Sequence, residues 1–592
     1  MELPGYLPIA DHGLIGDLGS AALVGSDGTI DWYCCGRFDA PSVFAAILDR
    51  RRGGFWRLAP AGKGWIARQL YLPETNVLIT RFIGGEGVVE VQDFMPVGGR
   101  PQRLIRSASC VKGRVMLEVG VEPRFDYARA DHQLELTADG AVFESPALRL
   151  SLSSAVPMKP TSRGVRAGFE LTAGESASFV LEPDGAPHRL AEDEVRAQRD
   201  ATAAFWRSWL ARSRYVGRWR EMVHRSALTL KLLTCESTGA LVAAPTASLP
   251  EQLGGSRNWD YRYTWIRDAA FTLFALLRLG FTGEAGAFMS WLTDRLGERS
   301  HAPGPLQIAY GIDGRAELPE VELSHLEGYC GSVPVRVGNG AAAQLQLDIY
   351  GELMDSVYLY NKYGAPISYD AWMEVVRIVE WLAENWDQED EGIWETRGGA
   401  SHFTYSRVMS WVAVERAIRI ARQRGLPADL VGWHDVRDRI HHQIMDRGWH
   451  PGRGAFVQRY GSEVLDASVL VMPLVKFVAP DDPRWLSTLD AIGRELVSDS
   501  LVYRYNPEAS PDGLRGNEGT FSMCSFWYVE ALARAGRLDE ARLVFEKMLT
   551  YANHLGLYSE EIGPAGEQLG NFPQAFTHLA LISAAFTLDR LL

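Results

Sequence analysis

Cysteine is scarce in this sequence, and its spacing fits no common kind of cysteine site. The 592 residues include six cysteines, and none of them are arranged as CxxC. Disulfide frameworks and cysteine-bound zinc sites need denser and more regular cysteines. We therefore expect a reduced protein with a cytoplasmic location.

Long apolar runs and basic clusters are also missing. The N-terminal stretch lacks the basic start and apolar run of a signal peptide. The most apolar stretch, residues 467–478, is interrupted by Pro473 and Lys476 and is too short to span a bilayer. Acidic residues outnumber basic ones by 74 to 60, and no block of Lys and Arg is available to contact phosphates. The sequence predicts neither a membrane partner nor a nucleic-acid partner.

The first 190 residues have the pattern of short β-strands. Residues 77–83 and 88–94 are apolar and β-branched, and the intervening GGEG is a hairpin signal. Similar short segments, punctuated by Gly and Pro, continue to about residue 181. We predict an N-terminal antiparallel β-sandwich over residues 1–190 and a helical linker over residues 191–216.

Beyond the linker the hydrophobic period is about 3.6 residues, which predicts about twelve helices. Their expected spans are 217–234, 268–280, 282–297, 340–363, 369–385, 404–425, 433–446, 465–478, 482–496, 519–535, 538–552 and 573–590. Connections after every second helix are short, which makes antiparallel neighbours, and the others are long. The pattern favours a closed ring of six hairpins over residues 217–592, with all long loops at one end. An open helical array is the alternative.

Two of the long loops carry residues suited to binding and cleaving a sugar. Trp265, Arg267 and Asp268 end the first loop, where a carboxylate and a guanidinium can hold vicinal hydroxyls and Trp can stack on a sugar face. The third loop contains Trp394 and Glu395. A carboxyl placed against apolar groups keeps its proton through desolvation, as a general acid must.

Further carboxylates lie in the last loop, opposite the third. Glu560 is the first candidate for a general base there, and Glu561 and Glu567 are the alternatives. Two carboxyls about 6.5–9.5 Å apart leave space for a water molecule and give inversion of the anomeric centre. The fifth loop carries Arg504 between two tyrosines.

These motifs resemble those of glycoside hydrolase family 15, which includes glucoamylases, glucodextranases and the bacterial and archaeal trehalases. WIRD at 265–268 is similar to the family's Trp-x-Arg-Asp segment, whose Arg and Asp bind the non-reducing glucose. IWE at 393–395 resembles the segment of the general acid, and SEE at 559–561 that of the general base. Arg504 matches the Arg-Tyr that contacts the same sugar. The resemblance implies a β-sandwich, a helical linker and an (α/α)6 barrel.

Other segments resemble the trehalase-like branch of this family. They include EGY at 327–329 and Arg336. Glu327 is a candidate for holding the leaving-group sugar. The alternative is a loop carboxylate that only pairs with Arg336.

The resulting hypothesis is an inverting, exo-acting α-glucosidase whose most favoured substrate is α,α-trehalose. Arg267 and Asp268 hold the glucosyl unit, Arg504 and Trp394 complete its pocket, Glu395 is the acid and Glu560 the base. The scheme needs no metal and no other cofactor, and its partner is a small-molecule or oligosaccharide α-glucoside. The alternatives are a glucoamylase or isomaltase, an inverting phosphorylase and a non-catalytic carbohydrate-binding protein. The oligomeric state stays open, with a homo-oligomer as one outcome.

Overall fold

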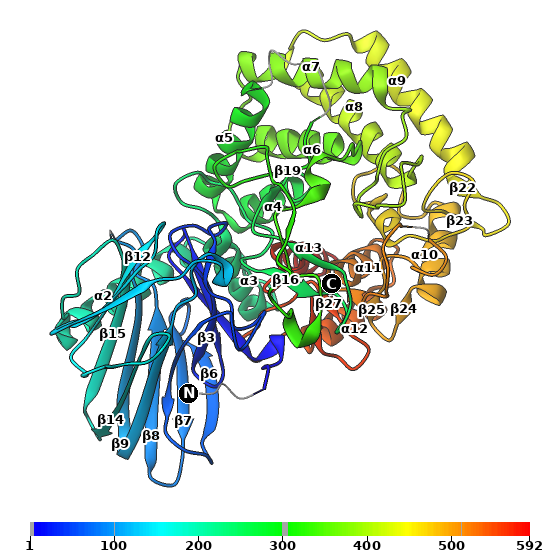
Figure 1. Ribbon diagram of the computed structural model, residues 1–592. Helices are drawn as coiled ribbons and strands as arrows, with labels where there is room; N and C mark the ends of the chain where they lie inside the picture. Colours follow the sequence, from blue (N-terminus) through cyan, green and yellow to red (C-terminus); the bar gives the residue numbers. More distant parts are fainter. Residues whose placement is uncertain (1–4, 100, 299–305, 511) are drawn as a thin grey trace.

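The N-terminal part of the chain is an antiparallel β-sheet domain (Figure 1). The computed structural model describes residues 5–99, 101–298, 306–510 and 512–592, so residues 299–305 of the second long loop lie outside it. The larger strands are β1 (His12–Gly16), β2 (Ala21–Gly25), β3 (Thr29–Cys34), β5 (Phe55–Pro60), β6 (Ile66–Tyr71), β7 (Leu78–Ile83), β8 (Gly87–Phe94), β9 (Leu104–Glu122), β10 (Gln133–Thr137), β11 (Gly140–Glu144), β12 (Arg149–Ser154), β14 (Val165–Thr172) and β15 (Ser176–Pro183). The predicted hairpin is confirmed as β7 and β8.

The 19-residue strand β9 joins the two halves of this sheet. Its first half pairs with β8 and β15, and its second half pairs with β5 and β14. Side chains of β7 and β8 alternate between buried and partly exposed positions, as the two-residue period predicts. β7 and β8 therefore bury one face, whereas β1, β2 and β3 are buried on both faces.

The rest of the chain is helical. The main helices are α2 (Glu192–Leu210), α3 (Arg220–Leu233), α4 (Ala269–Leu279), α5 (Thr282–Glu298), α6 (Asp348–Tyr363), α7 (Tyr369–Asn385), α8 (Thr404–Arg424), α9 (Leu430–Gln443), α10 (Pro483–Glu495), α11 (Ser522–Arg534), α12 (Leu538–Leu549) and α13 (Ala575–Leu591). Within the described residues, none of them has the length and the apolar character that crossing a bilayer requires.

The helix predicted over residues 465–478 is wrong. The structure has only a short 3-10 helix there, η5 (Ala467–Val471), which begins where the Asp466 side chain accepts a hydrogen bond from the Ser468 backbone N–H. Pro473 has no N–H to continue a helical ladder, which explains why the apolar pattern does not become an α-helix.

The inner elements of the helical part form a closed circle of contacts. α4 packs on α6, α6 on α8, α8 on η5, η5 on α11, α11 on α13, and α13 back on α4. Other helices lie outside this circle, such as α5 against α4 and α12 against α11. The long connections lead into the first turns of the inner helices, so residues distant in sequence meet at one end of the circle.

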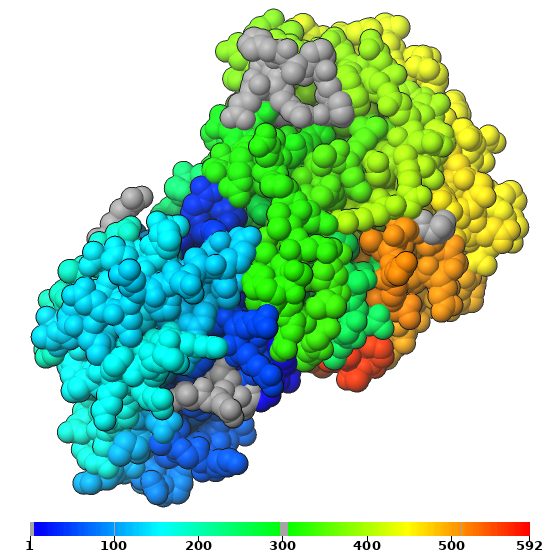
Figure 2. All heavy atoms as spheres, viewed as in Figure 1, coloured from blue at the N-terminus to red at the C-terminus, as the bar shows by residue number. Residues whose placement is uncertain are grey.

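The β-domain contacts one side of the end of the circle at which the long connections meet. Arg262, buried in the helical part, donates hydrogen bonds to Asp260 and to the Ala40 carbonyl, and lies 5.7 Å from the centre of the Trp32 ring. Arg315 pairs with Asp39 of the β-domain at 2.7 Å. Figure 2 shows the blue and cyan β-domain lying against the green part of the helical region. The two parts are thus joined by buried polar contacts as well as by α2.

Candidate active site

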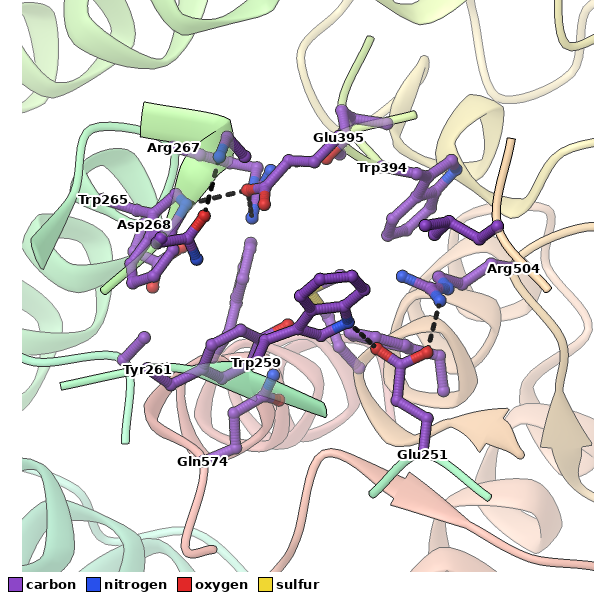
Figure 3. A pocket seen from close by; sticks show the side chains of 18 of the residues that line it. Glu251, Trp259, Tyr261, Trp265, Arg267, Asp268, Trp394, Glu395, Arg504 and Gln574 are labelled. Carbon is purple, nitrogen blue, oxygen red and sulfur yellow. Dashed lines mark hydrogen bonds and ion pairs between the residues drawn. The ribbon is translucent and has the colours of Figure 1, made fainter. Parts of the chain in front are cut away.

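A cavity opens at the first turns of the inner helices, and its lining is aromatic and charged (Figure 3). Six aromatic side chains, three carboxylates and three arginines surround it together with smaller residues. The lining residues are Ala243, Glu251, Trp259, Tyr261, Trp265, Arg267, Asp268, Asn339, Ala341, Ile393, Trp394, Glu395, Arg397, Arg504, Leu514, Phe521, Met523, Gln574 and Phe576. The sequence-predicted residues 265, 267, 268, 394, 395 and 504 are all among them.

Glu395 projects into this cavity from a strained turn. Its φ is +56°, a left-handed backbone that non-glycine residues rarely adopt and that often marks a functional site. Its carboxyl Oε1 accepts hydrogen bonds from Trp265 Nε1 at 2.8 Å and Arg267 Nη2 at 3.1 Å. Arg267 also donates to the Ile393 carbonyl, which fixes the turn. The surroundings of Glu395 are therefore more polar than its apolar sequence neighbours suggested.

Asp268 lies immediately before α4 but does not cap it. Within the described residues its side chain accepts no hydrogen bond from the first turn of the helix. Burial raises the pKa of Asp268 to about 7, against the opposing charge of Arg267. A buried carboxyl without a capping role is available for a ligand's hydroxyl groups.

Arg504 and Trp394 form the opposite wall of the cavity. The Arg504 guanidinium lies 5.4 Å from the centre of the Trp394 ring and 5.0 Å from that of Phe521. Trp394 Nε1 donates to Asp466, and Arg504 pairs with Glu518 and Glu251. These contacts fix both side chains before any ligand arrives.

Three buried carboxylates, those of Glu251, Glu518 and Glu561, offer oxygen atoms within 4.8 Å of one another. Such a group can hold a cation, but two arginines already lie on it. Arg257 pairs with Glu518 at 2.8 Å, and Arg504 pairs with Glu251 at 3.2 Å. We interpret the group as a buried ion network that positions Arg504.

Glu560 lies next to the cavity but behind Tyr261. It is fully buried, and its Oε1 accepts a hydrogen bond from the Tyr261 hydroxyl at 2.5 Å. The Tyr261 and Trp265 rings are 5.4 Å apart, and Trp265 in turn holds Glu395. Glu560 and Glu395 are therefore linked through two aromatic residues. Burial raises the pKa of Glu560 to about 8, and the nearby charge of Glu251 adds to this effect.

A glycine makes room for the Glu560 carboxyl. Gly570 has a φ of +72°, and a Cβ added there would lie 2.5 Å from Glu560 Oε2. The neighbouring Asn571 N–H points to the same oxygen at 3.4 Å. Any larger residue at 570 would displace the carboxyl.

The two alternative base candidates point elsewhere. Glu561 Oε2 accepts a hydrogen bond from the Gly519 backbone N–H at 2.7 Å, and its Oε1 faces Arg504 at 3.8 Å. Glu567 accepts a hydrogen bond from the Ala565 N–H at 2.8 Å, in the turn between β27 (Glu561–Ile562) and β28 (Gln568–Leu569). Glu560 is hydrogen-bonded to the cavity wall through Tyr261, whereas Glu561 reaches the wall only through its 3.8 Å contact with Arg504.

Glu327 and Arg336 lie outside the cavity lining. Glu327 is exposed, and its Oε1 accepts a hydrogen bond from the hydroxyl of Tyr6, in the N-terminal segment, at 2.5 Å. Arg336 pairs with Glu320 and Glu322 instead, and its guanidinium lies 5.0 Å from the centre of the Trp259 ring. Of these two, only Arg336 contacts a residue that borders the cavity.

Sequence reasoning missed several lining residues, chiefly Glu251, Trp259, Tyr261, Arg397 and Gln574. Trp259 and Tyr261 lie close to Trp265 in the first long loop, so the local abundance of aromatic residues was a usable signal. Glu251 has no such signal, because it stands alone in a loop and gains its partners only on folding.

Two family models together match most of the chain. The model described as glycosyl hydrolases family 15 matches residues 217–586, and that described as trehalase-like, N-terminal, matches residues 5–185. The chain therefore belongs to glycosyl hydrolase family 15, and it is a glycoside hydrolase. This confirms the family identified from the loop motifs.

Curated relatives match over nearly the whole length. A trehalase of Mycolicibacterium smegmatis is 41% identical over 98% of this chain and 91% of its own. A trehalase of Thermoplasma volcanium is 36% identical over 100% of this chain and 95% of its own. A bacterial glucoamylase solved with acarbose has a TM-score of 0.76 at 14% identity, covering 100% of this chain and 95% of that one. This last likeness concerns the fold alone.

Replacing Glu251 should change how stability depends on pH. Burial raises its folded-state pKa from 4.5 to about 7. Below pH 4.5 the group is protonated in both states, whereas between these values only the unfolded chain loses the proton, so wild-type stability falls as pH rises. We expect Glu251→Gln to remove up to about 3 kcal/mol of this loss between pH 5 and 8.

The measurement is the Tm of wild type and Glu251→Gln at pH 5 and pH 8. The Tm of Glu251→Gln relative to that of wild type should be higher at pH 8 than at pH 5. The exposed Glu380→Gln serves as control and should show the same difference at both pH values. A pH-independent difference for Glu251→Gln would contradict the raised pKa.

Proposed function

We propose that this enzyme is an inverting, exo-acting α-glucosidase that hydrolyses α,α-trehalose to glucose. The observation that carries the proposal is full-length similarity to proteins named trehalase, at 36–41% identity in three of them. The cavity supports it with paired sugar-binding and proton-transferring groups. A glucoamylase or isomaltase activity is the second candidate, because an isomaltose glucohydrolase of Kribbella flavida is 27% identical over 46% of the chain.

We propose the same division of the chain for the finer architecture. Residues 1–190 form a β-sandwich, 191–216 a helical linker, and 217–592 an (α/α)6 barrel. Support comes from the two halves of the sheet that share β9 and from the closed circle of inner elements. The boundaries of the two family matches, residues 5–185 and 217–586, agree with this division.

The glucosyl unit is held between the walls described above. Asp268 and Arg267 bind its hydroxyls on one side, Trp265 lies beside them, and Trp394 with Arg504 covers the other side. Because these groups are already fixed by hydrogen bonds and ion pairs, little reorganisation accompanies binding. On the acceptor side, Trp259 carries the guanidinium of Arg397 at 4.6 Å and that of Arg336 at 5.0 Å.

Hydrolysis proceeds in a single displacement. Glu395 gives its proton to the bridging oxygen as the bond from that oxygen to the anomeric carbon breaks. A water molecule attacks the anomeric carbon from the opposite face, and its proton passes to Glu560. Tyr261, bonded to Glu560, is placed to orient this water. The chemistry uses no metal ion and no other cofactor.

A panel of α-linked glucosides with NMR detection of the product anomer tests this function. We expect trehalose to be cleaved with the highest kcat/KM and the attacked unit to appear first as β-glucose. Faster cleavage of maltose, isomaltose or dextrin would select the second candidate. Initial α-glucose from the attacked unit would refute inversion, and phosphate-dependent release of glucose 1-phosphate would indicate a phosphorylase.

A cytoplasmic location is part of the proposal. All six cysteines are unpaired in the structure, and five of them are buried. Free cysteines are typical of reducing compartments.

A further inference from the structure

A second cavity, of about 440 Å³, lies at the opposite ends of the inner helices. Its lining includes residues from the last turns of α4, α6, α11 and α13, whereas the active-site cavity lies at the first turns of the inner helices. Phe271, Trp527 and Phe576 stand between the two, with ring centres 5.0–5.9 Å apart. The second cavity is thus separate from the active site.

Basic side chains dominate this cavity although the chain carries a net charge of −14. The basic residues that line it are Arg214, Arg278, Lys362, Arg416, Arg419, Lys476, Arg534 and Arg590. Of the described residues, two carboxylates line the cavity with them, those of Asp355 and Glu352. Two more pair with these cations from outside the lining: Glu415 pairs with Arg416 and Arg419, and Glu530 pairs with Arg534 at 3.5 Å. Asp355 is paired with Arg416 at 2.5 Å, and Glu352 accepts a hydrogen bond from Tyr405. Burial raises the pKa of Glu352 well above its ordinary value, so it adds no negative charge.

Most of these cations lack an acidic partner. Within the described residues, no carboxylate oxygen lies within 4.0 Å of the side-chain nitrogens of Arg214, Arg278, Lys362, Lys476 or Arg590. The Nε of Arg534 is buried and has no hydrogen-bond partner there. Burial and the charge of Arg590 lower the pKa of Arg278. The cavity therefore concentrates uncompensated positive charge.

Helix ends explain this charge only in part. Cations are favoured near helix C-termini by the helix dipole, which accounts for Arg278, Arg534 and Arg590. Arg214 and Lys476 lie on no helix, yet they line the same cavity. The helix dipole also does not explain why the buried Nε–H of Arg534 has no hydrogen-bond partner among the described residues.

The remaining wall is apolar and aromatic. The Arg278 guanidinium lies 4.8 Å from the centre of the Phe274 ring, and Leu277, Leu474 and Val475 complete the surface. Guanidinium groups bind phosphate through paired N–H donors, and apolar side chains favour a carbon skeleton. The volume is in the range of small-molecule pockets.

We infer that this cavity binds a small organic phosphate, with the phosphate on Arg278, Arg534 and Arg590 and the carbon part against Phe274 and Leu474. The site does not depend on which glucoside the enzyme cleaves. Its occupancy can therefore be measured without any activity assay.

Calorimetric titration of the full-length protein with phenyl phosphate and with inorganic phosphate, at constant ionic strength in chloride, tests the inference. We expect saturable 1:1 binding of both, with phenyl phosphate at least about fivefold tighter because its ring covers apolar surface. The Arg278→Gln/Arg590→Gln variant should weaken both by at least about tenfold. Lys476→Gln, an exposed change that leaves the core intact, should weaken them by about two- to fivefold.

The matched control is Arg422→Gln, which removes an exposed arginine from the last turn of α8, outside the cavity. It should leave both affinities within about twofold of wild type. Absence of saturable binding would overturn the inference, and so would equal affinity of the two probes. Equal weakening by Arg422→Gln and by the variants of the cavity would overturn it as well.

Discussion

Glu395→Gln is expected to lower kcat on the natural α-glucoside by at least about 10³-fold, with little change in KM. The amide keeps an oxygen for the Trp265 and Arg267 donors, which hold the side chain at 2.8 and 3.1 Å, but it has no proton to give. The loss therefore falls on the chemical step, and the fold should persist because the side chain keeps its shape.

A substrate with a different leaving group separates acid catalysis from general damage. In α-glucosyl fluoride the leaving group is fluoride, which departs without being protonated. Glu395→Gln should therefore retain a much larger share of wild-type activity on this substrate. Glu391→Gln, in the same loop but outside the cavity lining, is the matched control and should behave as wild type. Equal losses on both substrates would contradict the acid role.

Glu560→Gln should lower kcat by about 10²–10⁴-fold on both substrates, because the attacking water must lose a proton whatever group leaves. Glu567→Gln should remain near wild type, since Glu567 only accepts a hydrogen bond within a surface turn. Glu561→Gln should act mainly on KM, because that carboxyl holds Gly519 and faces Arg504. A larger fall in kcat for Glu561→Gln than for Glu560→Gln would transfer the base role to Glu561.

The pH dependence of kcat/KM tests the same assignment of Glu560 as the general base. A general base must be ionised, and burial raises the pKa of Glu560 to about 8. Below that value a growing fraction of the enzyme holds the proton and lacks its base. We therefore expect the ionisation of Glu560 to give kcat/KM a limb that rises with pH, while loss of the Glu395 proton gives the falling limb. Glu560→Gln should lose the rising limb, and an unchanged rising limb in that variant would argue against Glu560.

Motifs contiguous in sequence were predictable, and contacts across the chain were not. WIRD at 265–268 and IWE at 393–395 combine their chemical groups within a few residues, and all of the residues singled out from them line the cavity. Tyr261 meets Glu560 across 299 positions, and no local pattern reports such a pairing. Glu251 likewise becomes a site residue only through Arg504 and Trp259.

The prediction of secondary structure had the same limit. Periodicity located the outer helices, such as α7 and α12, because each buries one stripe of apolar residues. It failed over residues 465–478, because Pro473 has no N–H to continue a helical ladder and only the short η5 forms there. Glu327 was predicted from a local motif to hold the leaving-group sugar. In the structure its carboxyl is hydrogen-bonded to Tyr6, which lies 321 positions earlier in the chain.

The buried Arg262 has a consequence for the evolution of this enzyme. Two site residues, Trp259 and Tyr261, flank Asp260, which that arginine ties to the carbonyl of Ala40 and to the underside of Trp32. Substitutions among the first 130 residues can thus shift the segment that carries Trp259 and Tyr261, although none of the substituted residues contacts the sugar. Libraries restricted to the cavity wall would overlook them, and grafting a foreign β-domain should alter turnover even when every sugar-contacting residue is retained.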